Sequence, residues 1–301
     1  MVPPGDLKEK VLKDAGFPLN STIIIAFFPF ADTPPDERTS IAPFALKNHY
    51  KDLVIRMREA LKSAGEPFSN LKRKEIRFFS NSRLPEKQMA KESGLGFIGK
   101  NTLLINKTFG SRGLLAGMIL PLALNPSDEA DSGKLKPGIN SCGNCRLCEK
   151  SCPGGALEDY RLDREKCLQH WTSSDGPIPD RLKKEWGVRI YGCTICQDVC
   201  PWNRNLPRGN SITRGLIDPV PSLDFFLSHT EEEIKEFFRG SAMGMSWFKG
   251  RHMIRNALIS TVSTEDSPPL DHIEAHGLSE DDGIKDAALW ALKRLKRDQE
   301  R

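Results

Sequence analysis

The chain has 301 residues, of which 38% are hydrophobic and 28% are charged, and its formal net charge is +4. This length supplies material for two or three domains with a core, and the weakly basic balance permits a nucleic-acid partner without requiring one. The longest apolar run, residues 114–124, is broken by Gly117 and Pro121 and is too short to cross a bilayer. The amino terminus lacks an apolar segment followed by a cleavage site. We therefore expect a cytoplasmic protein with no membrane partner.

The sequence pattern of residues 1–135 predicts an α/β layer. Residues 22–28 are β-branched and aromatic, which is typical of a buried strand, and apolar residues recur at helical spacing from Phe44 until Gly65 ends the pattern. The expected helices cover residues 7–16, 44–64 and 86–93, and the expected strands cover 21–30, 76–79, 102–105 and 114–122.

A glycine-rich segment, Gly94 to Asn101, lies inside this layer and resembles a phosphate-binding P-loop. A P-loop follows a strand and has Ser or Thr directly after its lysine, whereas this segment follows a predicted helix and has Asn101 after Lys100. A nucleoside triphosphate site is therefore disfavoured. Two interpretations stay open: a turn that serves packing, or a backbone cradle for a flat or phosphate-bearing cofactor.

All eight cysteines lie between residues 142 and 200, after a linker rich in Pro, Ser, Asp and Gly over residues 125–141. The first group has the spacing Cys-x2-Cys-x2-Cys-x3-Cys-Pro of bacterial ferredoxins, in which three thiolates bind one [4Fe-4S] cluster and the fourth binds another. The motif therefore predicts two [4Fe-4S] clusters and a ferredoxin-like domain over residues 136–205. The chain is too long to be a ferredoxin alone.

The second cysteine group, aligned on its own Cys-Pro, lacks the first position of the motif, which falls at Ile190. Cys167 is the only remaining thiol that can fill the gap. We therefore expect one cluster to be held by Cys142, Cys145, Cys148 and Cys200, and the other by Cys152, Cys167, Cys193 and Cys196.

Two other interpretations of the thiols fit the sequence less well. Structural zinc prefers four-ligand sets such as two separated Cys-x2-Cys pairs, which the triple Cys142, Cys145 and Cys148 matches poorly. Disulfides need an oxidising compartment, and nothing in the sequence directs export. The iron–sulfur interpretation is therefore favoured over both.

Residues 206–301 predict a helical module of antiparallel pairs. A basic run at residues 293–297 fits a solvated helix end that complements the helix dipole, with phosphate contact as the minor alternative. The expected helices cover residues 231–238, 248–262, 269–276 and 283–297. The whole chain is thus predicted to be an α+β multidomain protein.

Several stretches resemble the epoxyqueuosine reductase family. They are Pro85-Glu86-Lys87, residues 94–106, the first cysteine run, residues 189–193 and 196–203, Gly240-Ser241-Ala242 and Arg255-Asn256. The resemblance covers most of residues 20–295, and its cysteine order followed by Cys-Pro-Trp-Asn is specific to the family.

The resemblance implies a fold with a reductive-dehalogenase-like amino-terminal layer and a HEAT-like carboxy-terminal module. It implies reduction of the epoxide of the queuosine precursor in tRNA, with a cobalamin cofactor and a low-potential electron donor such as ferredoxin or flavodoxin. No Asp-x-His-x-x-Gly cobalamin motif occurs here, in agreement with a family that binds cobalamin without a histidine ligand. The positions that the resemblance places beside the cofactor are Lys100, Asn101, Gln169, Thr194 and Ile195.

The sequence departs from the family pattern at its acid. Where the family has a proton-donating aspartate, counting back from Glu86 reaches Ser80, and a hydroxyl is too weak an acid to replace a carboxyl directly. His49 is an alternative acid, against the simpler interpretation of a helix-surface histidine. Two further alternatives stay open: an electron carrier without a corrinoid, or a paralogue with another substrate. A basic surface for tRNA at Lys72, Arg73, Lys74 and Arg77 competes with an ordinary solvated turn.

Overall fold

A computed structural model describes residues 4–30, 40–124, 142–206, 214–265 and 268–299, and the chain forms two compact units. The first, here called the sheet unit, comprises residues 1–32, 49–146 and 200–212. The second, the helical unit, comprises residues 33–48, 147–199 and 213–301. Residues 142–146 and 200–206 thus belong to the sheet unit and residues 147–199 to the helical unit. The three-domain division at residues 135 and 205 stays a prediction, and the linker over 125–141 lies outside the described residues.

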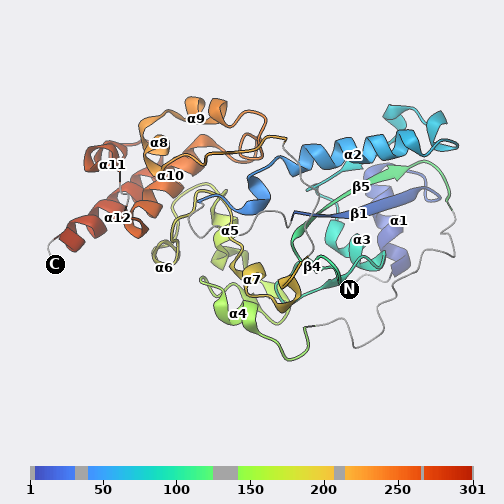
Figure 1. Ribbon diagram of the computed structural model, residues 1–301, viewed down its shortest axis with the longest axis horizontal. Coiled ribbons are helices and arrows are strands. Elements are labelled where there is room, and N and C mark those ends of the chain that lie inside the picture. The colour runs from blue at the N-terminus through green and yellow to red at the C-terminus, as the bar shows by residue number, and fades with distance from the viewer. Residues whose placement is uncertain (1–3, 31–39, 125–141, 207–213, 266–267, 300–301) are drawn as a thin grey trace. The chain divides into compact units, whose positions relative to one another are not determined.

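The sheet unit is built on an antiparallel sheet of three strands in the order β1-β5-β2 (Figure 1). A separate hairpin pairs β3 with β4. The elements are α1 (Pro4–Ala15), β1 (Thr22–Pro29), α2 (His49–Ser63), two 3-10 turns (Phe68–Asn70 and Arg73–Glu75), β2 (Arg77–Phe79), α3 (Glu86–Glu92), β3 (Phe97–Ile98), β4 (Leu104–Ile105), β5 (Gly113–Leu120) and a 3-10 turn (Pro201–Asn203).

The central strand β5 is buried on both faces because helices cover both sides of the sheet (Figure 1). Ile119 packs with residues of α1 and α3, whereas its neighbours Met118 and Leu120 pack with α2. This alternation follows from the two-residue period of a strand, and a strand covered on both faces is apolar throughout. The apolar run over residues 114–124, which is too short to cross a bilayer, contains most of this strand. Strand β1, predicted to be buried, is only half-buried because it lies at the edge of the sheet.

The helix predicted over residues 44–64 begins only at His49. The preceding residues form a 3-10 turn (Pro43–Ala45) and belong to the helical unit, where their backbone groups have other partners. The Ala42 amide donates to the Tyr191 carbonyl and the Asn48 amide to the Arg214 carbonyl. Apolar spacing continues through this segment, but these hydrogen bonds prevent a continuous helix.

Among the described residues after 213, the helical unit contains the four predicted carboxy-terminal helices and α8, which was not predicted. Ser222 caps the start of α8, and a Thr230–Glu233 capping box starts α9. The elements are α4 (Leu147–Ser151), β6 (Leu157–Glu158), β7 (Arg161–Leu162), a 3-10 turn (Arg164–Lys166), α5 (Leu168–Trp171), α6 (Asp180–Lys184), α7 (Ile195–Asp198), α8 (Leu223–Ser228), α9 (Glu231–Phe237), α10 (Gly250–Ser260), a 3-10 turn (Thr261–Ser263), α11 (Leu270–His276) and α12 (Asp282–Gln299).

Helix α10 is the centre of the helical unit. Ten of its eleven residues are buried, including Arg255 and Asn256, and its apolar side chains share one core with α8, α9, α11, α12 and the segment around Trp186. A helix buried on all sides has to place its polar side chains against internal hydrogen-bond partners. Among the described residues, no helix is both long and apolar enough to span a membrane.

Candidate functional site

Three thiols gather in the sheet unit, those of Cys142, Cys145 and Cys200. Burial raises the pKa of Cys200, and the neighbouring thiols of Cys142 and Cys145 raise it further, while the backbone amides of Trp202 and Asn203 oppose that shift. These effects require the three sulfur atoms to lie near one another.

The β3–β4 hairpin supports this group of thiols. Its turn is closed by hydrogen bonds from Gly99 N to Leu103 O and from Thr102 N to Gly99 O, both 2.9 Å. The Lys100 amide then donates to Cys142 Sγ at 3.3 Å. The Lys100 ammonium donates to the carbonyls of Gly143 and Cys145 at 2.9 and 3.0 Å. Lys100, predicted to contact a cofactor, thus lies against the loop that carries two of the thiols.

The glycines of this segment are needed for its packing. A Cβ on Gly96 would lie 2.3 Å from the Ile105 carbonyl oxygen, and a Cβ on Gly99 would lie 2.5 Å from the Ile105 side chain. Asn101 is only 4% exposed; its Oδ1 accepts from Leu103 N, but its Nδ2 has no acceptor among the described residues. The packing interpretation therefore accounts for both glycines, but it does not account for the buried Asn101 Nδ2, which lacks an acceptor among the described residues.

The Cys-Pro-Trp-Asn sequence anchors Cys200 to the same unit. Asn203 Oδ1 accepts from the Ser111 amide at 2.7 Å, and Asn203 Nδ2 donates to Ser111 Oγ at 3.0 Å. The Trp202 ring meets Phe97 of β3 edge-on, with ring centroids 5.3 Å apart. The hairpin and the Cys200 turn therefore hold each other in place.

Four other thiols gather in the helical unit: Cys152, Cys167, Cys193 and Cys196. Burial raises the pKa of Cys167, and the thiols of Cys193 and Cys152 raise it further. Burial also raises the pKa of Cys196, with smaller contributions from Cys193, Cys167, Cys152 and Cys148. Cys167, which stands alone in the sequence, is therefore beside the thiols it was predicted to join.

Polar groups hold this second set. The Ala156 amide donates to Cys152 Sγ at 3.3 Å, and the Cys193 amide donates to Gln169 Oε1 at 3.0 Å. Thr194 Oγ1 donates to Asp198 Oδ2 at 2.8 Å. Gln169 and Thr194, predicted to contact a cofactor, lie within this group together with half-buried Ile195. Cys148 is buried on α4, which packs against α7.

None of the eight cysteines forms a disulfide, so each thiol is available as a ligand. In the described part of the chain, no three or more His, Cys, Asp and Glu side chains are grouped so as to hold a single metal ion. Soft thiolates in two groups, with amide N–H donors directed at sulfur, are the donor set that iron–sulfur clusters use.

Comparison with known proteins supports this interpretation. Residues 141–203 match the family of 4Fe-4S double cluster binding domains. The epoxyqueuosine reductase of Lactococcus garvieae is 33% identical over 69% of this chain and 57% of its own length. The solved epoxyqueuosine reductase of Streptococcus thermophilus superposes with a TM-score of 0.72 at 28% identity, over 91% of this chain and 73% of that one. A crystal structure of an epoxyqueuosine reductase with an epoxyqueuosine-modified tRNA-Tyr stem loop gives a TM-score of 0.67 at 26% identity, over the same shares of the two chains.

The chain is therefore similar to epoxyqueuosine reductases over most of its length. It spans less than two thirds of the length of the Lactococcus garvieae relative, 57%.

Ser80 lies just after β2, and its hydroxyl donates to the Leu115 carbonyl of β5 at 2.8 Å. The carboxylate of Glu86 accepts from the amides of Ser82 at 2.7 Å and Asn81 at 3.1 Å. Burial raises the pKa of Glu86, and those hydrogen bonds oppose the shift. Glu86 therefore shapes the loop that begins at Ser80, and the Ser80 proton is engaged with the backbone.

His49 begins α2 and is 7% exposed, with its ring 6.0 Å from that of Phe30. The simpler interpretation, a histidine on the helix surface, is therefore wrong, because the His49 side chain is buried. Lys72, Arg73 and Lys74 lie in or beside an exposed 3-10 turn, and Arg77 begins β2 with its side chain exposed.

The residues that support the thiols could not be recognised in the cysteine spacing. Asn203 was visible in the Cys-Pro-Trp-Asn signature, but its partner Ser111 is 92 residues away. Arg255 and Asn256 were noted only as part of a resemblance. A signal did exist in their case, since adjacent Arg and Asn in a helix with apolar residues on every side need buried partners.

Proposed function

We propose that this chain is an oxidoreductase that reduces an epoxide on a tRNA nucleoside, epoxyqueuosine. Two electrons and two protons break both carbon–oxygen bonds of the epoxide, a carbon–carbon double bond forms, and the oxygen leaves as water. The observation that carries the proposal is the gathering of Cys167 with Cys152, Cys193 and Cys196 in a chain that superposes on epoxyqueuosine reductases over 91% of its length. That gathering supports the second ligand set that a two-cluster relay would require.

In the proposed enzyme, one [4Fe-4S] cluster is held by Cys142, Cys145, Cys148 and Cys200, and the other by Cys152, Cys167, Cys193 and Cys196. When bound, each cluster would act as a one-electron carrier. The Lys100 and Ala156 amides donate to Cys142 and Cys152 Sγ and so stabilise negative charge on sulfur.

Cobalamin is the proposed second cofactor, and it would supply a reduced, strongly nucleophilic metal centre. The sheet unit fits such a group at Asn101, whose buried Nδ2 needs an acceptor. Lys100 would act from the cluster side, because its ammonium is engaged by Gly143 and Cys145 carbonyls. Gln169, Thr194 and Ile195 are proposed to contribute from the helical unit.

The proposed substrate is a tRNA, in line with the related epoxyqueuosine reductase solved with a modified tRNA-Tyr stem loop. The proposed electron donor is a low-potential protein such as ferredoxin or flavodoxin, because [4Fe-4S] clusters of the ferredoxin kind have low potentials. A tRNA substrate and reduced clusters together favour the cytoplasm.

The proton source differs from the family pattern. Ser80 stands at the position of the acid and its hydroxyl already donates to Leu115 O, so it can only relay a proton from water. This favours a second candidate function: a two-cluster protein that passes electrons to another substrate, or to a partner protein without using a corrinoid.

Anaerobic reconstitution tests the proposal. We expect about eight iron atoms per chain, binding of hydroxocobalamin and reduction of epoxyqueuosine in a tRNA stem loop with a low-potential donor. A protein with both clusters that binds no hydroxocobalamin would support the carrier, and fewer than about eight iron atoms would refute both functions.

Complementation of a strain unable to reduce epoxyqueuosine, with the unmodified chain and with Ser80→Asp, tests the substrate. Rescue by the unmodified chain means that the missing carboxylate is dispensable. Rescue by Ser80→Asp alone identifies the proton source as what this chain has lost. Failure of both, with clusters and corrinoid bound, points to a different substrate.

A further inference from the structure

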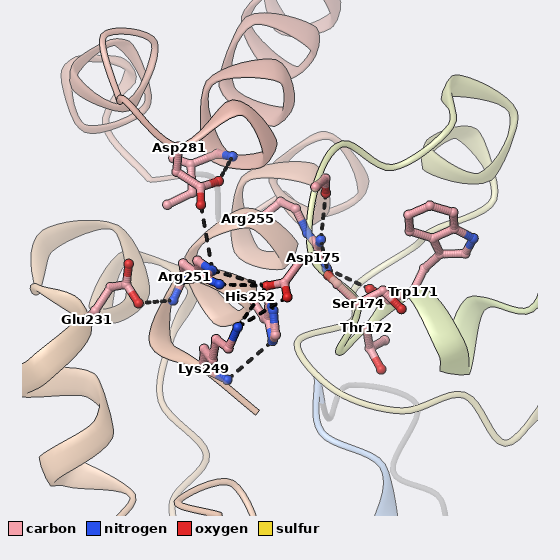
Figure 2. A network of polar contacts seen from close by, with 12 residues as sticks. Trp171, Thr172, Ser174, Asp175, Glu231, Lys249, Arg251, His252, Arg255 and Asp281 are labelled. Atoms are coloured by element: carbon pink, nitrogen blue, oxygen red, sulfur yellow. Dashed lines mark hydrogen bonds and ion pairs between the residues drawn. The ribbon is translucent and has the colours of Figure 1, made fainter. Parts of the chain in front are cut away.

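Two adjacent side chains in the middle of α10, Arg255 and Asn256, are buried and turned toward a loop far away in the sequence. They are 2% and 0% exposed. The Arg255 guanidinium donates to the carbonyls of Trp171 at 2.6 Å, Ser174 at 2.5 Å and Gly176 at 2.8 Å. It also contacts Asn256 Oδ1 at 3.0 Å, which fixes the two side chains relative to each other. Figure 2 shows the Arg255 side chain directed at this loop.

Asn256 extends the contact to a second segment. Its Nδ2 donates to the carbonyls of Thr172 and Ile190, each at 2.8 Å. Trp171 ends α5, which Cys167 precedes, and Ile190 lies three residues before Cys193 in the sequence. The Arg255–Asn256 pair thus bonds to the backbone that follows one thiol of the second set and to the backbone that precedes another.

The same two segments are also joined to each other by hydrogen bonds. Thr172 Oγ1 accepts from the Gly192 amide at 3.4 Å and donates to the Gln169 carbonyl at 2.8 Å. Gln169 Oε1 in turn accepts from the Cys193 amide at 3.0 Å. Displacement of the Thr172 carbonyl would therefore shift the Cys193 backbone through these hydrogen bonds.

The charge of Arg255 is retained in spite of its burial. Burial lowers the pKa of Arg255 to about 10, and Asp281 and Asp175 partly offset the shift. A guanidinium presents several donors in a fixed plane, which suits three carbonyls at once, whereas an ammonium is a compact charge without that planar fork. Arg255 therefore fixes the shape of the loop, in addition to supplying a positive charge.

The outer side of the same loop is tied by a separate, surface network. Asp175, with its side chain 61% exposed, accepts from Lys249 at 3.2 Å and Arg251 at 2.8 Å, and contacts His252 Nε2 at 2.9 Å (Figure 2). Within the loop, this network contacts only the Asp175 side chain. Its removal is a matched comparison, because α10 then loses a contact with the loop while the contacts of Arg255 and Asn256 with the carbonyls stay.

We infer that Arg255 and Asn256 are positioning residues for the second cluster, which hold the segments of Cys167 and Cys193 at the separation the cluster requires. The inference rests on the proposed cluster ligated by Cys152, Cys167, Cys193 and Cys196. Supporting residues outside the ligand shell typically change metal affinity by about 10- to 100-fold.

The test measures iron release to a chelator and the electron paramagnetic resonance spectrum of the reduced protein. The variants are Arg255→Met, Arg255→Lys and Asn256→Ala, with Arg251→Ala as the matched control on the same helix. A Cys196→Ser variant, which removes a ligand of the second cluster, identifies the signal and the release phase that belong to that cluster.

We expect the second cluster of Arg255→Met and Asn256→Ala to release iron about 10- to 100-fold faster, with the other cluster unchanged. Arg255→Lys should lie between Arg255→Met and the unmodified chain, and Arg251→Ala should match the unmodified chain. Should Arg255→Met fail to fold, Asn256→Ala and Arg255→Lys carry the same prediction.

Equal loss of both clusters, or unchanged release from both, overturns the inference while the proposed function stands. Unmodified protein with fewer than about eight iron atoms would instead overturn the proposed function.

Discussion

The two groups of thiols are supported in different ways. In the sheet unit, the loop of Cys142 and Cys145 is held by Lys100 at the tip of a hairpin, through its own amide and ammonium groups. In the helical unit, the segments around Cys167 and Cys193 are held by side chains of α10, up to 84 residues away in the sequence. The two groups of thiols therefore rely on two different kinds of scaffold. The first should be sensitive to backbone shape and the second to buried side chains.

The largest effect is expected from removing one thiol of each group, Cys200→Ser or Cys196→Ser. Each variant should lose one cluster and retain about four of about eight iron atoms, because serine is a poor ligand for iron in this setting. Iron and sulfide analysis measures the loss. The spectra of the two variants should differ and should sum to features of the unmodified protein.

A single variant that loses all iron would show that the two clusters do not form independently. Identical remaining spectra in Cys200→Ser and Cys196→Ser would contradict the division of the ligands into two sets.

Two groups of thiols could be expected because cysteine spacing is a local signal that survives without knowledge of the fold, whereas the full ligand sets stay a prediction. Cys167 could be assigned by elimination, and it lies beside Cys152 and Cys193. The long elements were predictable for a similar reason: helical spacing and the apolar run of β5 are properties of the chain itself. The start of α2 was not, since Asn48 and Ala42 are drawn into hydrogen bonds with distant carbonyls.

The supporting groups could not be predicted because their partners are decided by tertiary packing. Nothing in the segment around Lys100 indicates that its amide meets Cys142 Sγ rather than a cofactor. The hairpin strand β3 was missed since glycine-rich sequence favours a turn, and here the glycines are required by the close approach of Ile105.

The next largest effect tests the backbone scaffold of the sheet unit, with Gly110→Ala. Gly110 has φ +58°, and a Cβ there would lie 2.1 Å from Asn203 Oδ1, the group that anchors the Cys200 turn. The left-handed conformation alone costs a non-glycine residue roughly 1–2 kcal/mol, and the overlap adds about 1–3 kcal/mol. Chemical denaturation and iron release should both change, with faster release from the cluster lost in Cys200→Ser.

Gly65→Ala is the matched control. Gly65 has φ +67° with nothing within 4 Å of an added Cβ, so it carries the conformational cost alone. It should lower the free energy of unfolding by roughly 1–2 kcal/mol and leave iron release unchanged. Equal effects of the two substitutions on iron release would show that Asn203 does not position Cys200.

The smallest effect tests the helical unit through pH. His252 is 2% exposed, its Nδ1 accepts from the Lys249 amide, and its Nε2 lies 2.9 Å from Asp175 Oδ1. Burial lowers the pKa of His252 below its ordinary 6.5, with Arg255 and Arg251 acting in the same direction and Asp175 against it. Folding therefore favours the neutral imidazole, which suits an Nδ1 that accepts a hydrogen bond.

As pH falls toward and below 6.5, the unfolded chain protonates His252 more fully than the folded chain, so stability is lost as pH falls. The loss is at most about 1.4 kcal/mol per pH unit, the limit for a difference of one proton. Asp175 contributes little there, because its lowered pKa matters only below its ordinary 3.8. His252→Gln keeps a donor toward Asp175 and removes the titration, so it should flatten the dependence.

Tryptophan fluorescence suits this measurement because four of the five tryptophans, all except Trp202, belong to the helical unit. Denaturation is followed anaerobically between about pH 7.5 and about pH 5.5, the range in which histidine titrates. If His252→Gln lost stability as steeply as the unmodified chain, the titrating group would lie elsewhere, and α10 would hold the Asp175 loop without an acid-sensitive contact. If instead the slope disappeared while iron release from the second cluster stayed constant, the surface network and the Arg255–Asn256 contacts would be separable supports of one loop.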